Sequence, residues 1–315
     1  MMWFTAAVQA HGAAAAHAAS EKEGFNAGET IIHHIANSAE HPLIPLPEIF
    51  GIDFSVTKHV FMLWLVALLV FVVVTWMVRR HLKQGPVPST AGSGLETVVE
   101  FVRDSIVAPN VGSKWVDTWT PLILTFFAFI FTANLIGLIP IFEVVRLMNH
   151  WVVGADSSTF LGRLLEGGTT ATANFNVTAG LAIVTFLAII VAGTRAHGFL
   201  QHWKNLVPSG LAWPIYVLLI PIELLSMFVK PFALTMRLAA NMTGGHIAIL
   251  AVLSLVFLFA EMARTAIAGI AVGLVISIPL AVGISALECI VVLVQAYVFT
   301  LLSAVFIGMA IHVHH

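Results

Sequence analysis

The sequence predicts an all-α polytopic membrane protein with about five membrane helices and one amphipathic surface helix. Hydrophobic residues make up 59% of the 315 residues and charged residues only 10%, whereas a soluble domain has about 25% charged residues. The mean hydropathy is +0.97, and several apolar runs reach the ~20 residues that a membrane helix needs. No run alternates with a period of two, so a transmembrane β-barrel is not expected.

Residues 1–57 are predicted to form an extramembrane arm rich in Ala, His, Gly and Pro. Within residues 1–20, an Ala-x-Ala pattern ends at Ala18 and is typical of a signal-peptide cleavage site. Against cleavage, the positively charged n-region is missing, and Gln9 and His11 interrupt the apolar stretch. Cleavage and retention both stay open. The arm's histidines lack zinc-site spacing, so no metal or cofactor is expected.

The membrane domain is predicted to cover 58–315, and its first span lies at about 59–79. This span is an unbroken apolar run that ends in Arg79, Arg80 and Lys83. Because cytoplasmic loops carry an excess of Lys and Arg, the amino terminus is expected outside the membrane. Five spans then leave the carboxyl terminus in the cytoplasm.

An amphipathic helix is predicted at about 93–108. Apolar residues recur there at three-four spacing, with charged residues between them: Leu95, Val98, Val99, Val102 and Ile106. We expect this helix to lie on the cytoplasmic membrane surface, because the neighbouring segments are all spans. Packing against a soluble partner is the alternative.

Four more spans follow, and the last two are unusually long. The second and third are expected at about 119–142 and 177–194, and the long ones at about 213–260 and 265–311. Each long segment is about twice the length that a bilayer core requires. They are therefore expected to bend, break or tilt strongly as an antiparallel hairpin, with prolines that permit breaks at Pro214, Pro221, Pro231 and Pro279.

A polar stripe crosses the first long segment. Glu223, Lys230 and Arg237 are spaced by seven residues, so a regular helix places them on one face. Asn241 and His246 continue this stripe. On the second long segment the spacing of seven recurs between two residues, with serines close to their face: Glu288 and Gln295, then Ser277, Ser285 and Ser303. Antiparallel pairing would bring Arg237 near Gln295 and His246 near Glu288.

These residues suggest a proton path with a fixed charge in its middle. An ionisable residue at the centre of a membrane helix costs ~2.5–3.5 kcal/mol. Glu223 and Lys230 also fit an interfacial ion pair, and Gln295 also fits interhelical hydrogen bonding. Arg237 lies far from either surface and stays protonated. Such a charge makes a nearby carboxylic acid release its proton, whereas His246 and Glu288 can change protonation state.

The motif KPFALTMRLAANMTGGHIAI, from Lys230 to Ile249, resembles the signature of subunit a of rotary F-type ATP synthases. Three further segments extend the resemblance from about residue 30 to the end: IIHH at 31–34, LILTFFAFIFTANLIGLIP at 122–140 and LVQAYVFTLL at 293–302. The Arg–Leu–x–x–Asn core with the downstream Gln295 is the most specific part.

The resemblance implies a stator subunit with two offset half-channels, beside a ring of c subunits and a peripheral stalk of b subunits. It assigns to Arg237 the role of facing the ring carboxylate and blocking leakage, with Asn241 and Gln295 around it. His246 and Glu288 match the pair that relays protons in the outer half-channel, in an order opposite to some members. Glu223 resembles an acid on the inner exit path, and Lys230 is a supporting residue.

Other functions are less well supported by the sequence. A proton-coupled secondary transporter would contain inverted repeats, and none is evident. An intramembrane metalloenzyme would need a cluster such as H-E-x-x-H, and ATP hydrolysis would need a G-x-x-x-x-G-K-[ST] loop. The chain has neither motif, and it lacks the large basic clusters of nucleic-acid binding. The long arm favours a bacterial inner membrane over an organelle inner membrane, and His246 with Glu288 favours protons over sodium.

Overall fold

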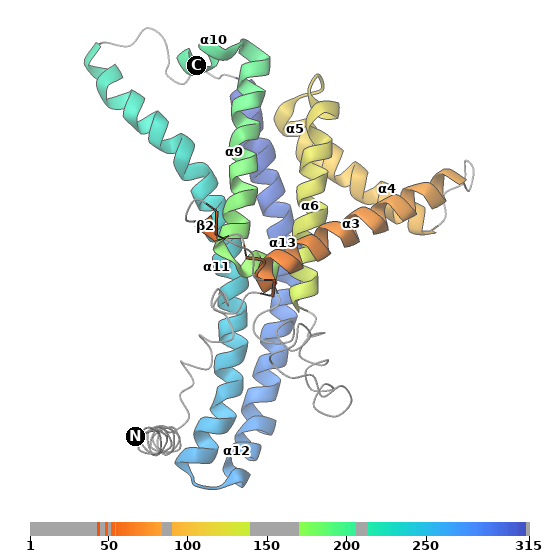
Figure 1. Cartoon of the computed structure of the whole chain (residues 1–315), viewed down its shortest axis with the longest axis vertical. Coiled ribbons are helices and arrows are strands. Elements are labelled where there is room, and N and C mark those ends of the chain that lie inside the picture. The colour runs from red at the N-terminus through yellow and green to blue at the C-terminus, as the bar shows by residue number, and fades with distance from the viewer. Residues whose placement is uncertain are drawn as a thin grey trace, which may run out of the picture. The chain divides into compact units, whose positions relative to one another are not determined.

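The computed structural model describes residues 43–44, 48–49, 52–53, 55–83, 90–138, 170–205 and 213–312. These residues are almost entirely helical, and five helices are long and apolar enough to cross a membrane (Figure 1). The predicted all-α polytopic fold class is confirmed. The possible signal peptide within residues 1–20 lies outside the described residues, as do residues 139–169 after the second predicted span. The boundary at residue 57 stays a prediction.

The chain forms two compact units, which are described separately. Among the described residues, the larger unit contains 43–244 and 287–312, and the smaller unit contains 245–286.

A short β-hairpin precedes the first membrane helix. Strands β1 (Glu48–Ile49) and β2 (Ile52–Asp53) pair antiparallel, with Ile49 opposite Ile52. An isolated bridge between Ile44 and Val56 extends the pairing. This hairpin lies within the segment predicted as an extramembrane arm, for which no strand was expected. The missed signal is a two-residue connection containing glycine, Phe50–Gly51, between two short segments that each contain isoleucine.

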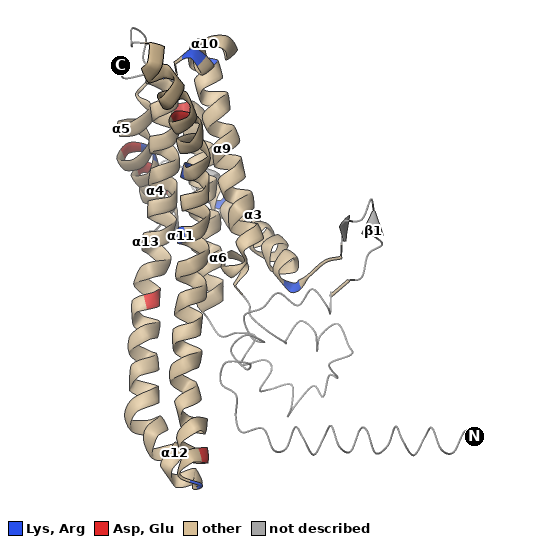
Figure 2. Ribbon diagram, turned by 90° about the vertical axis from the view of Figure 1, so that its left-hand side faces the viewer, with Lys and Arg blue, Asp and Glu red and all other residues tan. Residues whose placement is uncertain are grey.

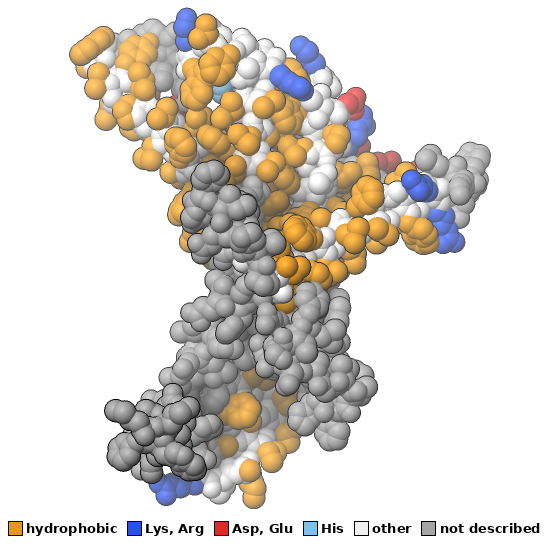
Figure 3. Space-filling model, in the orientation of Figure 1, with side chains coloured by type: hydrophobic (Ala, Val, Ile, Leu, Met, Phe, Trp, Pro, Cys, Tyr) orange, Lys and Arg blue, Asp and Glu red, His pale blue; other side chains and the backbone are white. Residues whose placement is uncertain are grey.

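Helix α3 (Lys58–Lys83) is the first candidate span, and many of its apolar side chains are exposed (Figure 3). Helix α4 (Thr90–Glu100) continues into the π-helical segment η1 (Phe101–Val107) and then α5 (Ala108–Val111). This confirms the predicted amphipathic helix. Its apolar residues in η1 pack inside the larger unit, against α6 (Val116–Leu138).

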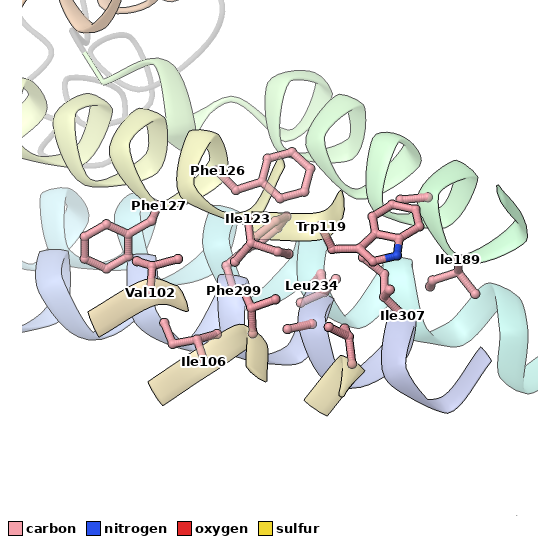
Figure 4. Close-up of a cluster of buried hydrophobic side chains, with 14 of the residues drawn as sticks. Val102, Ile106, Trp119, Ile123, Phe126, Phe127, Ile189, Leu234, Phe299 and Ile307 are labelled. Carbon is pink, nitrogen blue, oxygen red and sulfur yellow. The ribbon is translucent and has the colours of Figure 1, made fainter. Parts of the chain in front are cut away.

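The core of the larger unit lies between η1, α6, α9 (Phe175–His197) and parts of the two last helices (Figure 4). Large apolar residues from each element meet there, for example Phe126 and Phe299, whose rings contact edge to face at 5.6 Å. The 3-10 turn η3 (Ala171–Ala173) precedes α9, and the short helix α10 (Phe199–Lys204) follows it.

Helix α11 (Trp213–Met262) is one continuous helix of 50 residues, which corresponds to about 75 Å at 1.5 Å per residue. Pro221 and Pro231 lie inside it, so the predicted option of a break at these prolines is wrong. The chain turns at 263–265, where Arg264 adopts a positive φ of 53°. It then runs through α12 (Ala266–Val272), the π-helical segment η4 (Gly273–Ser277) and α13 (Ile278–Ile311). Figure 2 shows few charged residues along α11 and α13.

Histidines hold the carboxyl end of α13 in the larger unit. The His197 Nε2 atom of α9 lies 2.8 Å from the carbonyl oxygen of Ile311. The His312 Nε2 atom lies 3.0 Å from the carbonyl oxygen of Val111, at the end of α5. These contacts fix α13 against both α9 and the end of the amphipathic helix.

Candidate functional site

Arg237 and Asn241 lie on an exposed face of α11. The buried face of this stretch is formed by Leu234, Leu238 and Met242, which point into the larger unit. Because successive residues are about 100° apart around a helix, Arg237 points well away from that buried face. No hydrogen bond or ion pair joins Arg237 to another residue within the part of the chain that the structure describes.

The exposed residues beside Arg237 on α11 have small, apolar side chains or none. Ala233, Ala240 and Gly244 are all exposed beside it, and a Cβ on Gly244 would meet nothing within 4 Å. Small residues allow a second helix to approach closely in a membrane. Larger exposed apolar side chains flank this strip, including Phe232 and Met236. The arrangement offers one guanidinium on a surface shaped for close helix packing.

Glu223 and Lys230 lie on the same face of α11, and both are half-buried. The Lys230 Nζ atom lies 5.7 Å from the centre of the Phe306 ring on α13. This contact sets the register between the two helices in the larger unit. The expected proximity of Arg237 to Gln295 stays a prediction.

Glu288 and Gln295 lie on the packed face of α13. Glu288 is 8% exposed and Gln295 is 5% exposed. Val292 and Ala296 are buried on the same side. The structure therefore separates the predicted residues into an exposed group on α11, with Arg237 and Asn241, and a buried group on α13.

His246 is half-buried and belongs to the smaller unit, whereas Glu288 belongs to the larger one. Their expected proximity stays a prediction.

A second polar group, not predicted from the sequence, lies where α6 meets η3. Asn134 of α6 is 0% exposed, and its Oδ1 atom accepts a hydrogen bond from the Thr172 hydroxyl. A Cβ on Gly137, one turn further along α6, would collide with Thr170. The Thr243 hydroxyl of α11 donates to the Ala173 carbonyl at 3.2 Å. The missed signal is a single asparagine in an otherwise apolar span.

A hydroxyl pair joins α9 to α13. The Thr185 and Ser303 hydroxyl oxygens lie 3.2 Å apart, and both residues are fully buried. Ser303 is one of the serines that the spacing places close to the Glu288 face. Here it acts as an interhelical hydrogen-bond partner, the kind of polar contact that membrane helices use for association.

Outside the predicted spans, His202 of α10 packs directly against Gly193 of α9, where a Cβ would collide with the imidazole. Burial, and secondarily the charge of His197, lowers the pKa of His202 below its ordinary value of 6.5. The neutral imidazole is therefore the form that this contact favours.

The all-α membrane fold and the polar stripe on α11 together define a class of protein: a polytopic α-helical membrane protein that presents Arg237 on a helix-packing surface. Comparison with known proteins then gives the family. The model of the ATP synthase A chain family matches residues 60–308. The chain belongs to the ATP synthase A chain family, which confirms the resemblance carried by the Lys230–Ile249 motif.

Relatives match over nearly the whole chain. "ATP synthase subunit a" of Anaeromyxobacter dehalogenans is 38% identical over 98% of this chain and 78% of its own length. "ATP synthase subunit a 2" of Chlorobium luteolum is 36% identical over 97% of this chain and 84% of its own. The protein of that name from Prosthecochloris aestuarii is 35% identical over 95% and 84%.

Proposed function

We propose that this protein is the proton-conducting stator subunit of a bacterial F-type ATP synthase. Its relatives carry the name of subunit a of that enzyme in bacteria. The observation that carries the proposal is the position of Arg237. Its charge lies on an exposed apolar face of a membrane helix and has no partner among the described residues.

An unpaired guanidinium facing lipid is costly, so membrane arginines normally pair with an anionic group or face water. In the proposed complex, the partner is a carboxylate on a rotating ring of c subunits. Ala233, Ala240 and Gly244 beside Arg237 permit a ring helix to approach closely. The exposed face of α11 is thus the surface that the ring passes.

The proposed mechanism follows from a charge that cannot be neutralised. A guanidinium stays protonated in proteins, so it neither carries nor donates a proton. As a protonated ring carboxyl comes close to Arg237, the positive charge favours the carboxylate form and the acid releases its proton. The same charge repels a free proton, which prevents direct flow between the two half-channels.

Two half-channels serve the ring on either side of Arg237. In the outer one, Glu288 and His246 pass protons toward the ring, since both groups can gain and lose a proton. In the inner one, the half-buried Glu223 receives the released proton, and Lys230 supports it electrostatically. Asn241 and Gln295 provide hydrogen-bonding groups near Arg237.

The chain acts without an ATP site, metal or cofactor of its own in this proposal, and proton flow past it turns the ring. A peripheral stalk of b subunits holds it in place within the bacterial inner membrane. The amino terminus lies outside and the carboxyl terminus in the cytoplasm, as the positive charges at the carboxyl end of α3 predict.

The test is ATP-driven proton pumping by the assembled enzyme in inverted membrane vesicles. The Arg237→Ala variant should lose pumping completely while the subunit stays in the complex. Arg79→Ala is the matched control, because Arg79 is an exposed arginine at the end of a membrane helix, and it should pump normally. Normal pumping by Arg237→Ala would overturn the proposed role.

A further inference from the structure

The smaller unit is a helical hairpin whose two helices touch along a row of small residues. A Cβ on Gly269 would lie 2.6 Å from the Val256 carbonyl oxygen and 2.7 Å from the Ala260 Cβ. Four residues on, a Cβ on Gly273 would lie 3.2 Å from a Val256 methyl group. Ser277 follows at the same spacing and therefore points toward the inside of the hairpin.

Ser277 is fully buried, and its hydroxyl has no hydrogen-bond partner among the described residues. Hydroxyls in the other helices commonly donate to a carbonyl four residues back, as Thr120 and Thr235 do. For Ser277, that carbonyl belongs to Gly273. The Gly273 carbonyl accepts the Ile278 N–H, five residues on, which is the bond that makes η4 a π-turn.

A buried hydroxyl without a partner is unfavourable, and a bound water normally satisfies it. π-turns inside helices are often found at functional sites. Both observations indicate that the hydroxyl is kept available for a ligand that hydrogen-bonds to it. Within a membrane-spanning hairpin, water is the ligand that fits.

Ser277 precedes Glu288 by eleven positions in the last long apolar segment. Ser285 lies between them, half-buried. The helix is continuous from Ile278 onward.

We propose that Ser277 is a water-binding residue on the outer proton path to Glu288. This inference rests on the proposed function and adds a residue to its entry half-channel. A proton moves along the ordered water toward the Glu288 carboxylate, while the serine keeps its own proton and only orients the water. The Ser277 hydroxyl lies in the π-turn η4.

The first experiment compares proton pumping in vesicles of the assembled enzyme. Ser277→Ala should slow pumping about fivefold, the size of one ordinary hydrogen bond, and Ser277→Thr should restore most of the rate. Ser254→Ala is the control in the same unit, because the Ser254 hydroxyl already donates to the Ala251 carbonyl at 2.7 Å. It should leave the rate unchanged.

The second experiment measures access of water by reaction of a cysteine with silver ions, which attack the thiolate. The background is Cys289→Ala, since Cys289 is the chain's single cysteine. Pumping by Ser277→Cys should be inhibited by silver. Val275→Cys should resist it, because Val275 is 74% exposed on the outer, apolar side of the same turn.

Equal resistance of both cysteine variants, or a wild-type rate in Ser277→Ala, would overturn this inference. The two proposals fail in different ways. If Arg237→Ala pumps normally, the proposed function is wrong. If Arg237→Ala blocks pumping while Ser277→Ala and Ser277→Cys behave like wild type, only the role of Ser277 is wrong.

Discussion

Gly308 of α13 lies directly against the backbone carbonyl of Asn110 in α5, so closely that a Cβ would collide with the carbonyl oxygen. A backbone group cannot swing aside as a long side chain can. The contact therefore fixes how near the last helix comes to the end of the amphipathic helix. Together with the bond of His312 to Val111, it locks the carboxyl end of α13 in place.

Gly308→Ala is expected to destabilise the protein by about 1–3 kcal/mol, the usual cost of overpacking. Gly283→Ala is the matched control on the same helix, because nothing lies within 4 Å of its added Cβ. Alanine favours a helix over glycine by about 1 kcal/mol, so the control should be neutral or stabilising. Thermal unfolding of the purified complex measures both. Equal stability of the two variants would show that α5 can move away.

Gly193→Ala should be destabilising because the added methyl group meets the His202 imidazole. The clash is with a side chain, so removing that side chain should relieve it. The double variant Gly193→Ala with His202→Ala is expected to be more stable than the sum of the single effects. A double-mutant cycle on unfolding temperature checks this. Additive effects would mean that the two residues do not touch.

Acidification is expected to weaken the contact between α9 and α10. The folded-state pKa of His202 lies below the ordinary 6.5, so the unfolded chain binds the proton more readily. The stabilisation is complete above pH 6.5 and is lost as the pH falls through the lowered folded value. His202→Gln should remove this dependence. Unfolding temperatures measured from about pH 7.5 to about pH 5 test it, and identical slopes for both proteins would refute it.

Arg237→Lys keeps a positive charge but should still lose ATP-driven pumping. A lysine ammonium can lose its proton when it is desolvated, and it lacks the planar fork of the guanidinium. The neutral amine would no longer block direct proton flow, so passive leak through the membrane sector should increase with pH. Proton flux in vesicles stripped of the catalytic sector measures this. If the Arg237→Lys enzyme pumps normally and shows no added passive proton leak, a positive charge alone is sufficient for the role of Arg237.

Exchanging His246 and Glu288 together tests whether they share one path. The double exchange His246→Glu with Glu288→His keeps both titratable groups and should retain more pumping than His246→Ala or Glu288→Ala. The comparison uses equal amounts of assembled enzyme. If the exchanged enzyme is the worst of the three, the two residues act separately.

Sequence alone predicted the membrane helices well, because continuous apolar runs are a local property. The amphipathic helix was found from its three-four spacing for the same reason. The hairpin at 48–53 was missed, since two strands of two residues each leave almost no pattern. The partnership of Asn134 with Thr172 was missed because it joins residues that are far apart in the chain.

The candidate site was predicted as a set of residues but not as a geometry. The spacing of seven gives a common face for Glu223, Lys230 and Arg237, but it cannot say whether that face is packed or exposed. The structure shows which faces are packed: Arg237 faces outward on α11, whereas Glu288 faces inward on α13. Which face is packed depends on how helices associate, and this information is spread over the whole chain.

The outward-facing arginine also bears on how the protein is made. A newly inserted chain would hold a bare cation against lipid until its neighbour arrives, a state that costs a few kcal/mol on membrane-insertion scales. If the proposed ring of c subunits is the partner of Arg237, assembly is then ordered: the ring must be present first, and a chain synthesised without it is suited to proteolytic removal. The Arg237 side chain, which acts in proton transport in the assembled complex, would thus also make stable insertion of the chain depend on the order of assembly.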